Sequence, residues 1–113
     1  MTVDWINELQ EELREFARDR DWQKYHTLQN LAALISTESG ELLALFRWGQ
    51  DAMTDCPDDV RVELADVLLG VLRFADVAGI DLRQAAQEKL RLNEENYPKS
   101  REAFPDKKMP DQK

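Results

Sequence analysis

The chain has 113 residues, of which 34% are charged, and a formal net charge of −8, so a single acidic domain is expected. An acidic surface repels the phosphate backbone of DNA and RNA, which argues against a nucleic-acid polymer as partner. No apolar run approaches the roughly 20 residues that cross a membrane. Cys56 is the only cysteine, which excludes an internal disulfide and a thiolate metal site. The first residues also lack the basic start and apolar stretch of a signal peptide, so a cytoplasmic protein is expected.

The first half of the chain predicts two helices. The spacing of apolar residues predicts the first helix from about Val3 to Arg18. A connection over Asp19–Thr27 follows it. The second helix is predicted to begin near Thr27, which is a good N-cap, and to end near Gly49, because glycine commonly ends helices.

A third helix is predicted after a polar loop over Gln50–Cys56. Pro57 suits its first turn, and the helix is expected to run to about Ala78 and stop at Gly79. Its second half is apolar on nearly every side: Leu64, Val67, Leu68, Leu69, Val71, Leu72, Phe74 and Val77. A helix that is apolar all round is buried all round. Three neighbouring helices hardly provide that cover, so a homo-oligomer with this helix in its middle is expected.

The last predicted helix is capped by Asp81 and ends before Pro98. We therefore expect residues 1–98 to form the domain and residues 99–113 a C-terminal tail. The sequence has neither the alternation of a strand nor an internal repeat. The predicted fold class is all-α, with four helices joined by short connections in a bundle-like arrangement.

Two pairs of acids interrupt the apolar stripes of the second and third helices. Glu38 and Glu41 are three residues apart, as are Glu63 and Asp66, and this spacing keeps each pair on one face of its helix. Carboxylates that face an interior must be paired, protonated or bound to a metal. Oxygen ligands without His or Cys select Mg²⁺ or Mn²⁺ over zinc. Such ions would allow an acidic chain to bind a small phosphorylated ligand.

Other readings of these acids stay open at this level. A single pair of acids on a helix usually lies on a face that is exposed to solvent. Two such pairs on adjacent helices make a metal site about as good an explanation as a solvated face. A di-iron bundle needs Glu-x-x-His pairs, and the only histidine, His26, lies in a loop. Glycine lowers the stability of a helix, so Gly40 inside the second predicted helix needs an explanation. A helix or a ligand could approach closely there, or the glycine could simply allow tight packing.

Short motifs surround the acidic pairs. The run ESGEL at residues 38–42 with FRW at 46–48, and the run ELADVL at 63–68, resemble the two signatures of the MazG-like nucleotide pyrophosphohydrolases. The run GIDL at 79–82, followed by Lys89, Asn93 and the Tyr-Pro pair at 97–98, is similar to the third segment of that family. The Asp-Trp and Tyr-His pairs at 21–22 and 25–26 resemble the lead-in of its dCTP pyrophosphatase branch. The resemblance spans about residues 19–98.

The resemblance implies an all-α homodimer or dimer of dimers. It implies a Mg²⁺-dependent enzyme, with Mn²⁺ as a possible substitute, that hydrolyses a (d)NTP to the monophosphate and pyrophosphate. The dCTP-like branch implies dCTP or a related dNTP and a role in cleaning the nucleotide pool. The residues that it implicates are the catalytic metal ligands Glu38, Glu41, Glu63 and Asp66, the phosphate-binding Lys89 and Asn93, and the base- and sugar-binding Trp22, His26 and Trp48.

The chain departs from the family pattern at two positions. Gly70 stands where related sequences usually have a tyrosine, and Asn96 where a lysine or arginine commonly precedes the Tyr-Pro pair. Both departures leave the substrate open. Two alternatives therefore stand beside the main hypothesis. One is an enzyme similar to phosphoribosyl-ATP pyrophosphatase, and the other is a non-catalytic helical interaction module whose acids bind Mg²⁺.

Overall fold

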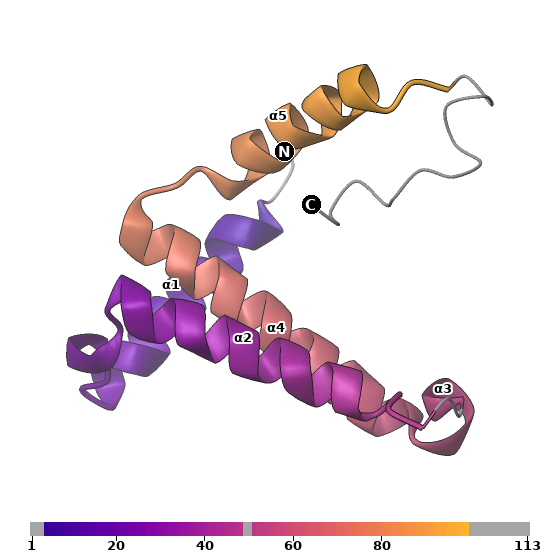
Figure 1. Ribbon diagram of the computed structural model, residues 1–113. Coiled ribbons are helices and arrows are strands. Elements are labelled where there is room, and N and C mark those ends of the chain that lie inside the picture. The colour runs from indigo at the N-terminus through magenta and orange to yellow at the C-terminus, as the bar shows by residue number, and fades with distance from the viewer. Residues whose placement is uncertain (1–3, 49–50, 100–113) are drawn as a thin grey trace. The chain divides into compact units, whose positions relative to one another are not determined.

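The structure is a computed structural model that describes residues 4–48 and 51–99. Within these ranges all regular structure is helical (Figure 1), and the all-α prediction is confirmed. The elements are α1 (Trp5–Asp19), the 3₁₀ helix η1 (Gln23–Tyr25), α2 (Leu28–Ala44), α3 (Ala52–Asp55), α4 (Pro57–Ala78) and α5 (Leu82–Asn96). The chain divides into two compact units between Ile80 and Asp81. All elements from α1 to α4, including η1, belong to the first unit, and α5 belongs to the second.

Capping side chains begin α2 and α5 where the sequence predicts. The Thr27 hydroxyl accepts a hydrogen bond from the backbone N–H of Asn30 at 3.1 Å. The Asp81 carboxylate accepts one from the backbone N–H of Gln84 at 3.0 Å. Each bond satisfies an amide that has no partner within its helix. Both predicted caps are confirmed.

The ends of α4 also follow its sequence. Pro57 is the first residue of the helix, and Gly79, directly after the last one, has a φ of +71°. Glycine adopts this left-handed conformation without the steric cost that a Cβ would add. The predicted boundaries of this helix are therefore confirmed.

Two expectations between α2 and α4 need correction. The second helix ends at Ala44, because residues 45–47 form tighter backbone hydrogen bonds to the third residue before each. Gly49, the predicted end, lies outside the described residues. The predicted polar loop contains the short helix α3, since the Asp51 carboxylate accepts hydrogen bonds from both the backbone N–H and the hydroxyl of Thr54. The predicted tail at residues 99–113 lies outside the described residues except for residue 99.

The first unit is built around α2 and α4, which pack side by side (Figure 1). Leu31 of α2 and Leu72 of α4 are its largest fully buried side chains. A Cβ built at Gly70 of α4 would lie 3.1 Å from Cγ1 of Ile35 on α2. This separation is too short for comfortable packing, so the glycine allows the two helices to approach closely. Gly70 therefore has a packing role at the centre of the unit.

The helix α1 is attached to α4 by polar contacts. The buried Gln10 side chain donates a hydrogen bond from Nε2 to the Leu72 carbonyl at 3.0 Å. Arg14 forms a two-bond pair with the Asp76 carboxylate at 2.9 and 3.0 Å. These contacts fix α1 beside the C-terminal half of α4, where it contributes side chains to the site described below.

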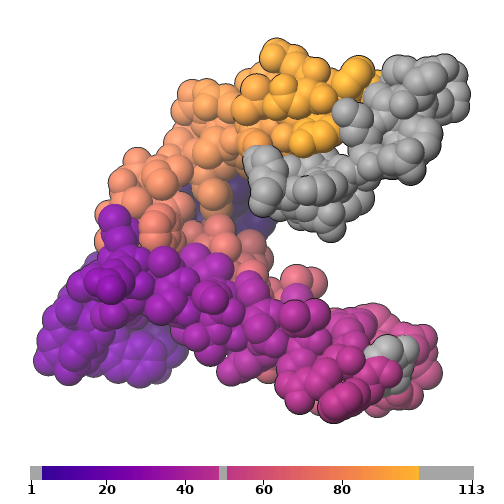
Figure 2. Space-filling view, viewed as in Figure 1, coloured from indigo at the N-terminus to yellow at the C-terminus, as the bar shows by residue number. Residues whose placement is uncertain are grey.

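Part of α4 stays exposed in the single chain. The side chains of Leu64 and Leu68 have 56% and 38% of their surface exposed. They line a shallow apolar depression together with Ala65, Val67 and Val71. Figure 2 shows the side of the first unit on which α2 lies in front of α4. The chain alone therefore leaves apolar surface in contact with water, and the expected homo-oligomer stays a prediction. No helix in the described ranges has the length and hydrophobicity to span a membrane.

Candidate functional site

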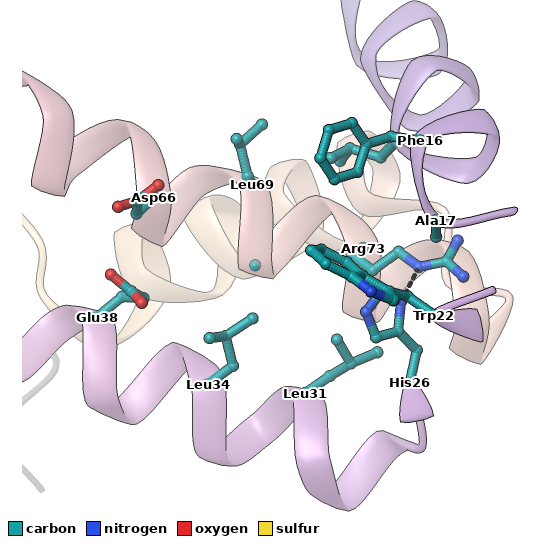
Figure 3. A pocket seen from close by; sticks show the side chains of 12 residues that line it. Phe16, Ala17, Trp22, His26, Leu31, Leu34, Glu38, Asp66, Leu69 and Arg73 are labelled. Atoms are coloured by element: carbon teal, nitrogen blue, oxygen red, sulfur yellow. Dashed lines mark hydrogen bonds between the residues drawn. The ribbon is translucent and has the colours of Figure 1, made fainter. Parts of the chain in front are cut away.

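The four acids singled out in the sequence gather between α2 and α4. A carboxylate oxygen from each of Glu38, Glu41 and Glu63 lies within 4.8 Å of the other two. Asp66 faces Glu38 from the opposite helix (Figure 3). One turn of helix separates the members of each pair, so two helices side by side are sufficient to collect all four groups. The arrangement could hold a metal ion.

No cation is paired with the cluster in the part of the chain that the structure describes. Glu38 and Glu63 each have one carboxylate oxygen that is shielded from solvent and has no hydrogen-bond partner. None of the salt bridges among residues 4–48 and 51–99 involves these acids. Burial, and after it the neighbouring carboxylate of Glu41, raises the pKa of both glutamates above the ordinary value. Two unpaired oxygens beside further carboxylates are a donor set that fits a hard divalent cation.

A cavity of about 270 Å³ extends from the acids along α2 and α4 towards η1. Glu38 and Asp66 line one end, and Trp22, His26 and Arg73 line the other (Figure 3). The wall between them is apolar and consists of Leu13, Phe16, Ala17, Leu31, Leu34, Leu69 and Gly70. Its volume is near the lower limit of small-molecule sites, about 300 Å³. The cavity thus joins an acidic end to an aromatic end.

The aromatic end contains a chain of polar contacts. Arg73 donates a hydrogen bond from Nε to Nδ1 of His26 at 2.9 Å. Its Nη1 lies 3.3 Å from the Asp76 carboxylate, which is also paired with Arg14. Burial, and after it the positive charge of Arg73, lowers the pKa of His26. The imidazole is therefore neutral at neutral pH.

Similarity to known proteins agrees with this geometry. No protein-family model matches the chain. Over 91 residues, 74% of its length, it is 36% identical to dCTP pyrophosphatase 1 of Mus musculus and 34% identical to that of Homo sapiens. The chain spans about half of these relatives, 54% of their length. A crystal structure of a pyrophosphatase from Archaeoglobus fulgidus matches with a TM-score of 0.82 and 39% identity, over 88% of this chain and 97% of that one. This chain belongs to the MazG-like nucleotide pyrophosphohydrolases.

The resemblance to the MazG-like family also predicts residues that bind the base, the sugar and the phosphates. The structure places only some of these residues at the cavity. Trp22 and His26 line the cavity, and Trp22 also packs edge-to-face on Phe16 at 5.5 Å. Trp48, by contrast, follows the C-terminal end of α2 and has 78% of its surface exposed. It is not part of the cavity lining. Its role stays a prediction.

Lys89 and Asn93 lie one turn apart on α5, in the second unit. The helical spacing places the two side chains on one face of α5. Their assignment as phosphate-binding residues of a MazG-like enzyme stays a prediction.

Sequence reasoning missed Arg73 and the contribution of α1. Arg73 is the only charged residue between positions 67 and 75. A lone cation in an apolar helix is buried only with partners, and this signal could have identified it. Leu13 and Phe16 belong to the apolar face of α1, which periodicity assigns only to the core.

The described part of this chain shows no close helix and no tight packing at Gly40, and the approach of a ligand there stays a prediction. A Cβ built there would meet no atom within 4 Å. Neither a neighbouring helix nor tight packing explains the glycine in the single chain. Gly70, by contrast, lines the cavity.

Proposed function

We propose that this protein is a Mg²⁺-dependent nucleoside triphosphate pyrophosphohydrolase that converts dCTP, or a related dNTP, to the monophosphate and pyrophosphate. The observation that carries the proposal is the convergence of carboxylates at one end of a cavity whose other end is aromatic. A nucleotide has the same polarity, with a charged triphosphate at one end and a flat base at the other. Similarity to dCTP pyrophosphatases supports the choice of substrate.

The proposed cofactor is Mg²⁺, for which Mn²⁺ could substitute. Its ligands would be Glu38, Glu41, Glu63 and Asp66, because hard anionic oxygens are what this ion prefers. The two unpartnered oxygens of the cluster support this assignment. When bound, the ion neutralises phosphate charge and lowers the pKa of a bound water.

The reaction proposed for this site is attack of water on the α phosphorus. A bond forms between the water oxygen and the α phosphorus, the bond to the α–β bridging oxygen breaks, and pyrophosphate leaves. A carboxylate of the cluster accepts the proton from the water. Glu41 is the best candidate, because it is exposed whereas Glu38 and Glu63 are partly buried.

The remaining residues are assigned to binding. Trp22 and His26 are proposed to hold the base and sugar, since aromatic rings stack on bases. Trp48 is proposed as a third residue of this group. Lys89 and Asn93 are proposed to contact the phosphates, where a lysine would offset the charge of the leaving pyrophosphate.

A homodimer or homotetramer is the proposed assembly. It would cover the exposed leucines of α4, Leu64 and Leu68, at little cost. Light scattering coupled to gel filtration measures the mass of the assembly. A Leu64→Glu, Leu68→Glu variant should shift that mass to the monomer, and a monomeric wild type would contradict the assignment.

Product formation from a panel of NTPs, dNTPs and phosphoribosyl-ATP, with and without Mg²⁺, tests the function. Metal-dependent release of pyrophosphate and monophosphate, lost in a Glu41→Gln variant, is the expected result. Preferential turnover of phosphoribosyl-ATP would favour the related pyrophosphatase instead. A protein that Mg²⁺ stabilises against heat but that hydrolyses none of these substrates would be the non-catalytic module.

A further inference from the structure

Arg73 determines which nitrogen of His26 carries the hydrogen. The arginine side chain is only 10% exposed, and its Nε lies 2.9 Å from Nδ1 of the histidine. An arginine Nε always carries a hydrogen and cannot accept one. Nδ1 must therefore be the accepting nitrogen. The single hydrogen of the neutral imidazole is then on Nε2.

The other contacts of Arg73 keep it in this orientation. Its Nη1 is paired with Asp76 at 3.3 Å. The Asp76 carboxylate is held in turn by the two hydrogen bonds from Arg14. Because Asp76 is held by Arg14, the guanidinium of Arg73 is anchored on the side away from His26.

The free nitrogen of His26 is directed at the cavity. Figure 3 shows the imidazole ring near Trp22 and Leu31, with the hydrogen bond from Arg73 on one side of the ring. None of the hydrogen bonds among the described residues involves Nε2, and His26 is part of the cavity lining. A donor that lines a cavity and has no partner among the described residues is available to a ligand.

We propose that Arg73 is a positioning residue that holds His26 as a neutral Nε2–H donor, and that this donor recognises a hydrogen-bond acceptor on the base of the nucleotide. The inference rests on the proposed function, which directs the triphosphate to the acidic end and the base to His26. An unconstrained histidine presents either a donor or an acceptor. A fixed donor selects a ring nitrogen or carbonyl oxygen of the base and disfavours an exocyclic amine at that place.

The tautomer can be measured directly, because His26 is the only histidine. A nitrogen–proton correlation spectrum of ¹⁵N-histidine-labelled protein should show an unprotonated Nδ1 and a protonated Nε2. Saturating dCMP with Mg²⁺ should shift the Nε2 signal more than the Nδ1 signal. A protonated Nδ1, or an unmoved Nε2 while equilibrium dialysis shows that dCMP is bound, would overturn the inference.

Variants separate positioning from a general structural role. Arg73→Met removes the donor to His26 and leaves Asp76 paired with Arg14. It should raise KM for dCTP about threefold to tenfold, the value of one hydrogen bond, with little change in kcat, and the ¹⁵N spectrum should show mixed tautomers. The matched comparison is Arg14→Met, which removes the other partner of Asp76 but leaves the hydrogen bond from Arg73 to His26 in place, and should change KM and the spectrum less than Arg73→Met does. If Arg73→Met does not fold, the tautomer of His26 in the wild type and the kinetics of His26→Leu still decide the inference.

Substitutions of His26, alone and together with Arg73→Met, form a double-mutant cycle. His26→Leu should raise KM like Arg73→Met, and His26→Gln, whose amide can donate near the position of Nε2, should recover much of the loss. His26→Leu should add little in the Arg73→Met background, since the two residues act as one unit. Wild-type KM in folded Arg73→Met and His26→Leu variants would overturn this inference and leave the proposed function intact. If the wild type neither binds nor hydrolyses any nucleotide, both proposals fail.

Discussion

The carboxylates of Glu38 on α2 and Asp66 on α4 face each other at the acidic end of the cavity (Figure 3). Partial burial of Glu38, and after it the charges of Glu41 and Asp66, oppose ionisation and raise the pKa of Glu38. A raised pKa in the folded state means that the folded protein holds the proton more tightly than the unfolded chain. The metal-free protein therefore gains stability as the pH falls through the raised pKa and loses it as the pH rises. In the metal-free protein, the raised pKa of Glu38 therefore marks a cost to folding stability.

Neutralising one acid should consequently stabilise the metal-free protein. Glu63→Gln keeps the shape of the side chain and removes a charge whose pKa is raised by burial. Its melting temperature in EDTA should exceed that of the wild type at neutral pH. Mg²⁺ should raise the melting temperature of the wild type and have little effect on the variant. A variant that melts below the wild type in EDTA would contradict the charge repulsion described here.

The two helical glycines predict opposite effects of alanine. A Cβ at position 70 would lie 3.1 Å from Cγ1 of Ile35, so overpacking that costs about 1–3 kcal/mol should outweigh the gain of about 1 kcal/mol in helix propensity, and Gly70→Ala should destabilise the protein by up to about 2 kcal/mol. Gly40→Ala adds a Cβ that meets nothing and should stabilise α2 by up to about 1 kcal/mol. Urea unfolding measures both. Equal effects would refute the packing role of Gly70, and a destabilising Gly40→Ala would reveal a surface that covers it in the assembly.

Substitutions of two tryptophans test where the base of the nucleotide binds. Trp22 lines the cavity, and Trp48 is highly exposed away from it. Loss of stacking costs about 1–3 kcal/mol per base, so Trp22→Ala should raise KM for dCTP roughly tenfold or more. Steady-state kinetics of Trp22→Ala and Trp48→Ala make the comparison. A normal KM in Trp22→Ala would remove the base from this cavity, and a raised KM in Trp48→Ala would show that this residue also reaches the ligand.

The pH dependence of stability should carry a signature of His26. Its pKa is lowered by burial and by Arg73, whereas in the unfolded chain it is about 6.5. As the pH falls through about 6.5, the unfolded chain takes up a proton that the folded protein does not. The free energy of unfolding therefore decreases until the pH passes below the folded pKa. Urea unfolding of the wild type and of His26→Gln from pH 8 to 5 should show this extra loss only in the wild type.

The acidic cluster was predictable because it depends on two local facts. Helical periodicity puts Glu38 beside Glu41 and Glu63 beside Asp66, and consecutive long helices tend to pack together. The other end of the cavity depends on the path of the chain between α1 and α2. Asp21 adopts a φ of 58° there, a left-handed backbone conformation that no simple sequence pattern predicts. The contact of His26 with Arg73 joins residues 47 positions apart, so neither residue reveals its partner in the sequence.

Hydrolysis of dCTP in ¹⁸O-labelled water tests the central claim most directly. The cluster of Glu38, Glu41 and Glu63 is proposed to support attack on the α phosphorus. With Mg²⁺ present, the wild type should yield unlabelled pyrophosphate and dCMP that carries the ¹⁸O. Glu41→Gln should be slower by about 10²–10³-fold. Label in pyrophosphate, release of orthophosphate with dCDP, or an unaffected Glu41→Gln variant would contradict the account.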